Sequence, residues 1–176
     1  MNEVLLKNCV QEFKNNNFDS FNEFFLETKK VVFYNIYSIV NSYELSEDLT
    51  QETYISFLNK VSELDLTKSV AGYLLTISKN IALNTIKREN KKEDIEDLEI
   101  YVSSNDKYKT NEEILLSKIK EIVNEKEFDV FIKHEYGELT FDEIAKLKKI
   151  PLATAIFQYN SAIKKLRKGL KEYESD

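Results

Sequence analysis

The sequence has 176 residues and a formal net charge of −6 at pH 7. A single cysteine (Cys9) and a single histidine (His134) exclude an intramolecular disulfide and an ordinary structural zinc site. The usual nucleophile–base pairs of hydrolases and a glycine-rich phosphate loop are also missing. We therefore expect no enzyme and no bound cofactor or metal.

The composition predicts an all-α fold. Three glycines and one proline leave little material for the tight turns of hairpins. We expect two small helical domains, residues 1–92 and 112–176, joined by a flexible acidic linker over residues 93–111. No apolar run approaches the ~20 residues of a membrane span, and the first residues show no export signal. The expected location is the cytoplasm, without membrane contact.

Residues 1–43 have the periodicity of two helices. Apolar residues recur at helical spacing from Val4 to Phe13, and three asparagines at positions 15–17 interrupt the pattern. The next helix runs from about Phe21 to Val40. Cys9 lies among the apolar residues of the first helix, which indicates a small buried hydrophobe rather than a reactive thiol.

The following helix has one apolar side and one acidic side. Ser46 is expected as its N-cap. Leu49, Tyr54 and Phe57 share the side that we expect to be buried. The opposite side carries the candidate binding residues Asp48, Gln51, Glu52 and Ile55. An apolar residue centred in an acidic stripe suits an interface, where a buried anchor is surrounded by polar contacts.

The segment 66–92 is apolar almost all round, which predicts a central helix. One narrow stripe differs, and it contains Tyr73, Thr76, Asn80, Asn84 and Lys87. An aromatic ring, amides and a cation along one line suit a surface that stacks on unpaired bases and holds phosphate. The alternative interpretation is an amphipathic core helix with a solvated polar face.

Positive charge is concentrated in two separate blocks. Residues 66–92 carry six basic and one acidic side chain, net +5, and residues 144–171 carry eight basic and no acidic side chains, net +8. Two basic blocks in an acidic background favour two separate contacts with a polyanion. The alternative for each block is a solvated lysine-rich surface.

The end of the chain has the pattern of a helix-turn-helix. Residues 140–143 read as a capping box that opens a short helix, and Pro151 can begin the last one. In that last helix Phe157, Asn160 and Lys164 are expected to point away from the core. A capped short helix, a turn and a longer basic helix are typical of a unit that places its second helix in the DNA major groove.

Together these segments resemble the bacterial RNA polymerase sigma factors, in particular the small two-domain extracytoplasmic-function type. The motifs that carry the resemblance are SEDLTQETYISFL, AGYLLTISKNIALNTIKR and LTFDEIAKLKKIPLATAIFQYNSAIKKLRKGL. Their order and spacing cover the chain from about Phe18 to Leu170. The resemblance implies an alternative sigma factor, which would bind core RNA polymerase and direct promoter-specific initiation without nucleotide hydrolysis.

The resemblance also implies a role for each matching residue. The implied core-polymerase contacts, made with the clamp helices of the largest subunit, are Asp48, Gln51, Glu52 and Ile55. The implied contacts to the minus-ten promoter element are Tyr73, Thr76, Lys79, Asn80, Asn84, Lys87 and Arg88. The implied contacts to the minus-thirty-five element are Thr154, Ile156, Phe157, Gln158, Asn160, Ser161, Lys164, Lys165 and Arg167. Further implied partners are the flap of the second-largest subunit and a possible anti-sigma factor.

One departure from the family concerns the recognition helix. The family usually has several arginines or lysines after the threonine at position 154, whereas this chain has Ile156, Phe157 and Gln158. Bidentate arginine-to-guanine contacts are therefore excluded there. One interpretation is an A·T-rich target, read by Gln158 or Asn160. The other is a weakened contact in which lysines hold phosphate without specifying sequence.

Two rival functions remain open at this point. The first is a helix-turn-helix regulator that acts without polymerase, which leaves the acidic stripe around Ile55 unexplained. The second is a helical adaptor with degenerate DNA binding, which the altered recognition helix favours.

Overall fold

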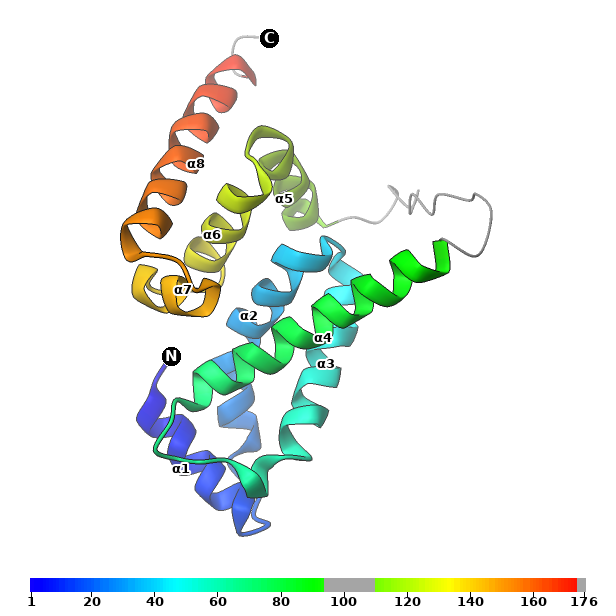
Figure 1. Ribbon diagram of the computed structural model, residues 1–176, viewed down its shortest axis with the longest axis vertical. Helices are drawn as coiled ribbons and strands as arrows, with labels where there is room; N and C mark the ends of the chain where they lie inside the picture. Colours follow the sequence, from blue (N-terminus) through cyan, green and yellow to red (C-terminus); the bar gives the residue numbers. More distant parts are fainter. Residues whose placement is uncertain (94–109, 174–176) are drawn as a thin grey trace.

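The computed structural model describes residues 1–93 and 110–173. Within them the chain is helical, which confirms the predicted all-α fold (Figure 1). In chain order the elements are α1 (Glu3–Lys14), α2 (Phe21–Val40), α3 (Tyr43–Leu58), the 3-10 helix η1 (Val61–Glu63), α4 (Val70–Glu93), α5 (Asn111–Ile122), α6 (Glu125–Glu135), α7 (Phe141–Lys148) and α8 (Leu152–Tyr173). Nearly all of the predicted linker, residues 93–111, lies outside the described residues.

Helices α2, α3 and α4 pack side by side, and α1 crosses their end (Figure 1). An aromatic core holds this first half together. The rings of Phe24 and Phe57 stack with centroids 5.1 Å apart, and Phe13 meets Phe24 edge-on at 5.5 Å. Cys9 is 3% exposed, as expected for a small buried hydrophobe. None of the described helices combines the length and apolarity that crossing a bilayer requires.

The start of α3 differs from the expectation. The helix begins at Tyr43 rather than after Ser46, and the N-cap is Ser42, whose hydroxyl accepts the Leu45 N–H at 3.3 Å. Ser46 is buried within the first turn, and its hydroxyl donates to the Ser42 carbonyl at 2.5 Å. Asn41, the residue before this N-cap, has φ 56°. The chain therefore changes direction there, and α3 starts earlier than the sequence pattern predicts.

In the second half, α5 to α8 form a compact group with α8 along one side (Figure 1). Reciprocal side-chain and backbone hydrogen bonds cap α5, α6 and α7, including the predicted box between Thr140 and Glu143. Lys149 ends α7 with φ 56°, and Pro151 precedes α8. The helix-turn-helix geometry of α7 and α8 is therefore built by a left-handed residue and a proline.

The two halves pack against each other through α2 and α6 and through α4 and α7. Tyr37 of α2 meets Phe128 of α6 with ring centroids 6.3 Å apart. A continuous apolar cluster includes Leu75 of α4 together with Leu139 and Ile144 of the second half. At the rim, Lys30 and Glu138 form an ion pair at 2.6 Å. We call this contact surface the seam.

Candidate nucleic-acid and protein interface

The predicted acidic surface lies on one exposed side of α3. Asp48, Gln51, Glu52 and Ile55 are all exposed, and 62% of the Ile55 surface remains accessible. Their spacing of three and four residues stacks them along a single face of the helix. Such an exposed apolar side chain, bordered by carboxylates, is explained if a partner protein buries it in an interface.

The opposite side of α3 fixes the position of this surface. Tyr54 is 4% exposed, and its hydroxyl lies 2.8 Å from that of Thr28 on α2. Burial raises the pKa of Tyr54, so the hydroxyl stays protonated and hydrogen-bonded. Thr53 is fully buried, and its hydroxyl donates to the Leu49 carbonyl at 2.7 Å. The acidic surface therefore projects from a helix that is packed along its whole inner side.

A groove of about 560 Å³ runs beside the acidic surface, between α2 and α3. Phe25, Phe33 and Tyr43 line it together with Gln51, one of the predicted contacts. These aromatic residues are not among the predicted contacts. Phe25 and Phe33 share one face of α2, but they lie within a run of apolar residues that indicates a buried core.

The predicted polar stripe lies along α4. Thr76, Asn80, Asn84 and Lys87 are exposed, whereas Tyr73 is half-buried against the ring of Phe57, with centroids 6.2 Å apart. The structure thus brings five stripe residues onto one side of a long helix. Arg88 lies beside them and donates to the Thr85 hydroxyl at 3.2 Å.

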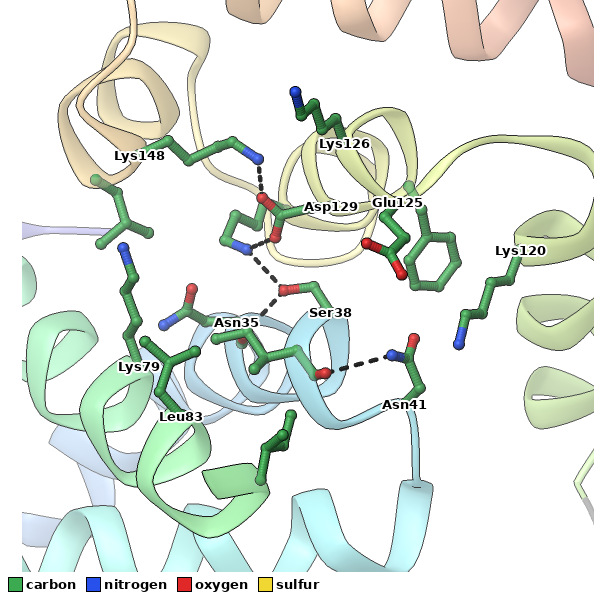
Figure 2. Close-up of a pocket in the computed structure, with 15 residues that line it drawn as sticks. Asn35, Ser38, Asn41, Lys79, Leu83, Lys120, Glu125, Lys126, Asp129 and Lys148 are labelled. Atoms are coloured by element: carbon green, nitrogen blue, oxygen red, sulfur yellow. Dashed lines mark hydrogen bonds and ion pairs between the residues drawn. The ribbon is translucent and has the colours of Figure 1, made fainter. Parts of the chain in front are cut away.

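Lys79 does not belong to this line. It shares a different side of α4 with Leu83 and Ile86, and all three face the second half of the molecule. Figure 2 shows the Lys79 side chain directed toward α7 rather than outward. A contact between Lys79 and DNA bound along the stripe therefore requires a change of rotamer or of domain arrangement.

The beginning of α4 is held by a residue that the sequence analysis missed. The Glu3 carboxylate of α1 accepts the Val70 N–H at 2.5 Å, the Ala71 N–H at 3.3 Å and the Ser69 hydroxyl at 3.1 Å. A carboxylate at a helix N-terminus satisfies unpaired N–H groups and complements the helix dipole. Because Glu3 lies 67 residues before Val70, no local pattern could reveal this cap.

A cavity of about 360 Å³ lies between the loop after η1 and the first turns of α4. Tyr73 and Thr76 line one side, and Glu63 and Asp65 line the other. The loop is ordered by Asp65, whose carboxylate accepts the N–H and the hydroxyl of Thr67 at 3.0 and 2.7 Å. These hydrogen bonds lower the pKa of Asp65. The stripe therefore ends at a polar recess with an aromatic wall.

The predicted recognition surface on α8 is only partly available. Phe157 is 72% exposed and Ile156 37%, and Asn160, Lys164 and Arg167 are exposed as well. Thr154 and Gln158 are half-buried, and no described residue hydrogen-bonds the buried Gln158 Oε1. The exposed surface of this helix thus combines two apolar side chains with polar and basic ones.

Two other predicted contacts on α8 are engaged by Glu127 of α6. Ser161 donates to Glu127 Oε1 at 2.7 Å, and Lys165 donates to Oε2 at 2.8 Å. Burial raises the pKa of Glu127, but the hydrogen bonds from Lys165 and Ser161 outweigh it and hold that pKa below its usual value. Ser161 and Lys165 therefore brace α8 against α6 in this arrangement.

The described residues contain no group of three His, Cys, Asp or Glu side chains that could hold a metal ion. His134, the single histidine, stacks on Phe141 with centroids 4.2 Å apart, and its Nδ1 lies 2.8 Å from the Leu139 carbonyl. It packs where α6 meets α7.

Comparison with known proteins matches residues 24–92 to Sigma-70 region 2. The sigma factor RpoE of Bartonella quintana, solved with the anti-sigma factor NepR, has a TM-score of 0.63 at 17% identity, over 86% of this chain and 97% of that one. CnrH, solved with the cytosolic domain of CnrY, has a TM-score of 0.68 at 11% identity, over 96% and 98%. No curated protein sequence matches the chain.

The region that carries the acidic surface and the polar stripe is thus a sigma-70 region 2 domain. Over nearly its whole length the chain has the fold of RpoE and CnrH, which are sigma factors of the extracytoplasmic-function type. Sigma factors act in transcription initiation and are not enzymes, in line with the expectation from composition.

Proposed function

We propose that this chain acts as a sigma factor and docks on core RNA polymerase through Asp48, Gln51, Glu52 and Ile55, against the clamp helices of the largest subunit. The observation that carries the proposal is the exposure of Ile55 inside a rigidly supported acidic face, in the domain that matches region 2. A buried apolar anchor within a ring of polar contacts gives an interface both affinity and register.

Helix α4 opens the promoter. The exposed amides of Asn80 and Asn84 lie where they can hydrogen-bond to unpaired bases, and Lys87 with Arg88 can hold the phosphates that follow. The recess beside Tyr73 has room for one extruded base against an aromatic ring. Strand separation would then be stabilised by captured bases and by polymerase, with no nucleotide hydrolysis in this chain.

The second half, residues 112–176, reads the minus-thirty-five element and meets the polymerase flap, while residues 1–92 act as the polymerase-binding and minus-ten unit. Within α8 the accessible groups are Phe157, Asn160, Lys164 and Arg167. Their chemistry suits contact with thymine methyl groups, adenine and phosphate rather than guanine. If α8 keeps only phosphate contacts, swapping A·T for G·C pairs in the upstream element will leave affinity unchanged.

Two further elements of the proposal rest on the comparisons. RpoE and CnrH were solved with the anti-sigma factor NepR and with the cytosolic domain of CnrY, which supports a protein of that class as a partner here. The place of action is the cytoplasm, where the polymerase works.

The experiment compares core-polymerase binding of the wild-type chain and the Asp48→Ala/Gln51→Ala variant by gel filtration and fluorescence anisotropy. The matched control is Gln11→Ala/Glu12→Ala, which removes one amide and one carboxylate from exposed positions of α1. We expect loss of binding in the first variant only, with both proteins folded by circular dichroism. Equal affinity for core polymerase in all three proteins would refute the proposal and leave the polymerase-independent regulator as the better assignment.

A further inference from the structure

Two helices, α3 and α8, each expose one large apolar side chain on a face that is otherwise polar. Ile55 of α3 is 62% exposed and Phe157 of α8 is 72% exposed. Among the large apolar side chains that the structure describes, only Val4, at 70%, is exposed to a similar degree. A single exposed apolar residue is ordinary on a protein surface, so the significance of Ile55 and Phe157 depends on the residues around them.

The face of α3 around Ile55 becomes negative toward the start of the helix. The residues on it are Gln51 and Glu52, four and three positions before Ile55, Asp48, seven positions before it, and Glu44, eleven positions before it. All four are exposed. Offsets of three, four, seven and eleven place side chains on one side of a helix. This face is therefore apolar at its C-terminal end and acidic at its N-terminal end.

The face of α8 around Phe157 has the same spacing in the reverse order and with the opposite charge. The residues on it are Asn160 and Ser161, three and four positions after Phe157, Lys164, seven positions after it, and Lys168, eleven positions after it. Both lysines are exposed, and neither forms an ion pair within residues 1–93 and 110–173. This face is therefore apolar at its N-terminal end and basic at its C-terminal end.

The two faces are complementary when the helices run antiparallel. With Phe157 placed against Ile55, Lys164 comes opposite Asp48, because seven residues rise about 10 Å along either helix. A parallel arrangement would instead carry Lys164 past Leu58, the last residue of α3. Only the antiparallel orientation therefore matches the apolar residues and the charges together.

The same register brings two further charge pairs together. Lys168 comes opposite Glu44, about 16 Å from the apolar contact on each helix. Arg167, exposed beside this line on α8, comes near Glu47, which is exposed beside the corresponding line on α3. Exposed ion pairs contribute little affinity one by one, but a row of them fixes orientation and register.

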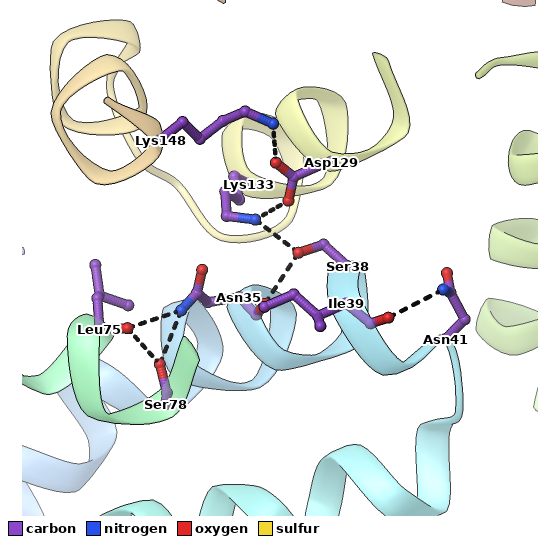
Figure 3. Close-up of polar contacts among 9 residues, drawn as sticks. All are labelled: Asn35, Ser38, Ile39, Asn41, Leu75, Ser78, Asp129, Lys133 and Lys148. Carbon is purple, nitrogen blue, oxygen red and sulfur yellow. Dashed lines mark hydrogen bonds and ion pairs between the residues drawn. The ribbon is translucent and has the colours of Figure 1, made fainter. Parts of the chain in front are cut away.

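The two faces cannot meet within one chain. Helix α3 packs on α2 and α4, whereas α8 packs on α6 and α7, and Figure 1 shows α3 and α8 on opposite sides of the molecule. The seam holds this arrangement. Lys133 of α6 donates across it to the Ser38 hydroxyl of α2 at 2.6 Å, and the Asp129 carboxylate accepts from both Lys133 and Lys148 (Figure 3). The complementary faces are therefore available only to another chain.

We propose that this chain associates with itself head to tail, and that α8 of one copy docks antiparallel on α3 of the next. Ile55 and Phe157 bury each other at one end of the contact, and the carboxylates and basic side chains align along the rest. Each added copy leaves one α3 face and one α8 face available at the ends, so the assembly grows with concentration. Because the contact is one helix face against another, the association is weak.

The consequence for transcription rests on the proposed function. The face around Ile55 is the proposed docking surface for core polymerase, and the face around Phe157 is the proposed upstream DNA contact. Self-association covers both, so it would keep surplus chain inactive until core polymerase competes for α3. The contact between copies does not depend on these roles, and it is measured without polymerase or DNA.

The test is analytical ultracentrifugation of the full chain, freed of nucleic acid, from about 5 to about 500 µM, the range in which a weak contact becomes populated. We expect the average mass to rise with concentration and to fall again at high salt, which screens exposed charges. Ile55→Glu and Phe157→Glu should each weaken association tenfold or more. The matched control is Val4→Glu, which adds the same charge at a similarly exposed apolar position of α1 and should associate as the wild type does.

A mixture of the two variants tests the head-to-tail geometry. The Ile55→Glu chain keeps an intact α8 face, and the Phe157→Glu chain keeps an intact α3 face. Mixed in equal amounts, they can form one intact contact and then cannot extend it. We therefore expect a species with the mass of two chains and nothing larger, whereas each variant alone stays a monomer.

Four results would overturn the proposal: a wild-type chain that is monomeric over the whole range, association that survives either glutamate substitution, a mixture that stays monomeric, or association that appears only when DNA is added. Circular dichroism checks that the variants, all at exposed positions, remain folded. A monomeric chain that binds core polymerase would refute self-association alone. A chain that associates but ignores core polymerase would refute the proposed function and leave the contact between copies intact.

Discussion

Helices α4 and α8 both carry basic and polar residues toward solvent, yet the structure prepares them differently for DNA. Along α4 the amides of Asn80 and Asn84 are exposed, and the stripe runs into a recess beside Tyr73. Along α8, Ser161 and Lys165 are hydrogen-bonded to Glu127, and the apolar side chain of Phe157 is 72% exposed.

This difference shows that the availability of a side chain for DNA contact depends on its neighbouring residues as much as on its own type. A lysine or serine on an outward face can still be taken by a carboxylate of the adjacent helix, and its contribution to DNA binding then carries the cost of breaking that contact. On these grounds we expect α4 to contribute most of the sequence-dependent contacts, and α8 to contribute a general electrostatic contact with a small apolar component.

The largest effect is expected at Tyr73. Base–aromatic stacking contributes about 1–3 kcal/mol per base, so Tyr73→Ala should lower open-complex formation roughly fivefold to hundredfold. Permanganate footprinting on a duplex promoter with reconstituted holoenzyme measures this. Tyr73→Phe keeps the ring and its packing on Phe57 and should behave nearly as the wild type. A template with a pre-formed bubble should partly restore Tyr73→Ala, and normal opening by Tyr73→Ala on the duplex would refute the role.

The brace on α8 gives the next largest effect. Glu127→Gln leaves Lys165 without its carboxylate and should lower the free energy of unfolding by about 1–3 kcal/mol, measured by urea denaturation at neutral pH. The control Glu121→Gln, at an exposed position of α5, should lower the free energy of unfolding by much less. Freed from Glu127, Lys165 becomes available to phosphate, so non-specific DNA affinity should rise in the same variant.

This effect also has a defined pH dependence. The folded-state pKa of Glu127 is lowered from 4.5, so its stabilisation is fully present above the unfolded value. It is lost as pH falls through the folded pKa. The difference in stability between wild type and Glu127→Gln should therefore be constant near neutrality and shrink below about pH 4.5. A difference that persists unchanged at pH 3 would contradict the ionised contact.

Local periodicity was sufficient to predict the α4 stripe and the acidic side of α3, because each is a set of residues three or four positions apart on one helix. It could not choose between Ser42 and Ser46 as the cap, because both are good capping residues and the reversal at Asn41 decides the matter. It also could not see Glu127 bridging to Ser161 and Lys165, 34 and 38 residues away. Contacts between helices decide which polar groups remain available for binding. A single sequence does not display these contacts.

The phosphate contacts of α8 should give a smaller and less specific effect. Lys164→Ala/Arg167→Ala should weaken binding of the full chain to any upstream duplex and reduce the salt slope by about 1 for each lost contact. Phe157→Ala should act only where a thymine methyl group is present, and should leave the slope unchanged. Fluorescence anisotropy over a salt series separates the two. Equal slopes in all three proteins would show that α8 does not contact phosphate through these residues.

The smallest effect is expected at the start of α4, and it tests whether the two helices behave independently. Glu3→Ala removes the carboxylate that caps Val70 and Ala71, at an expected cost of about 1 kcal/mol. For a chain of this size that is roughly 2–4 °C in melting temperature, which scanning calorimetry resolves. Glu23→Ala, at an exposed position in the first turn of α2, is the matched control. Because Glu3 supports the recess beside Tyr73, single-stranded minus-ten DNA should bind less well to Glu3→Ala, while duplex binding through α8 should not change. A parallel loss of both activities would mean that the seam transmits the disturbance from α4 to α8, and the contrast between the two helices would then have to be abandoned.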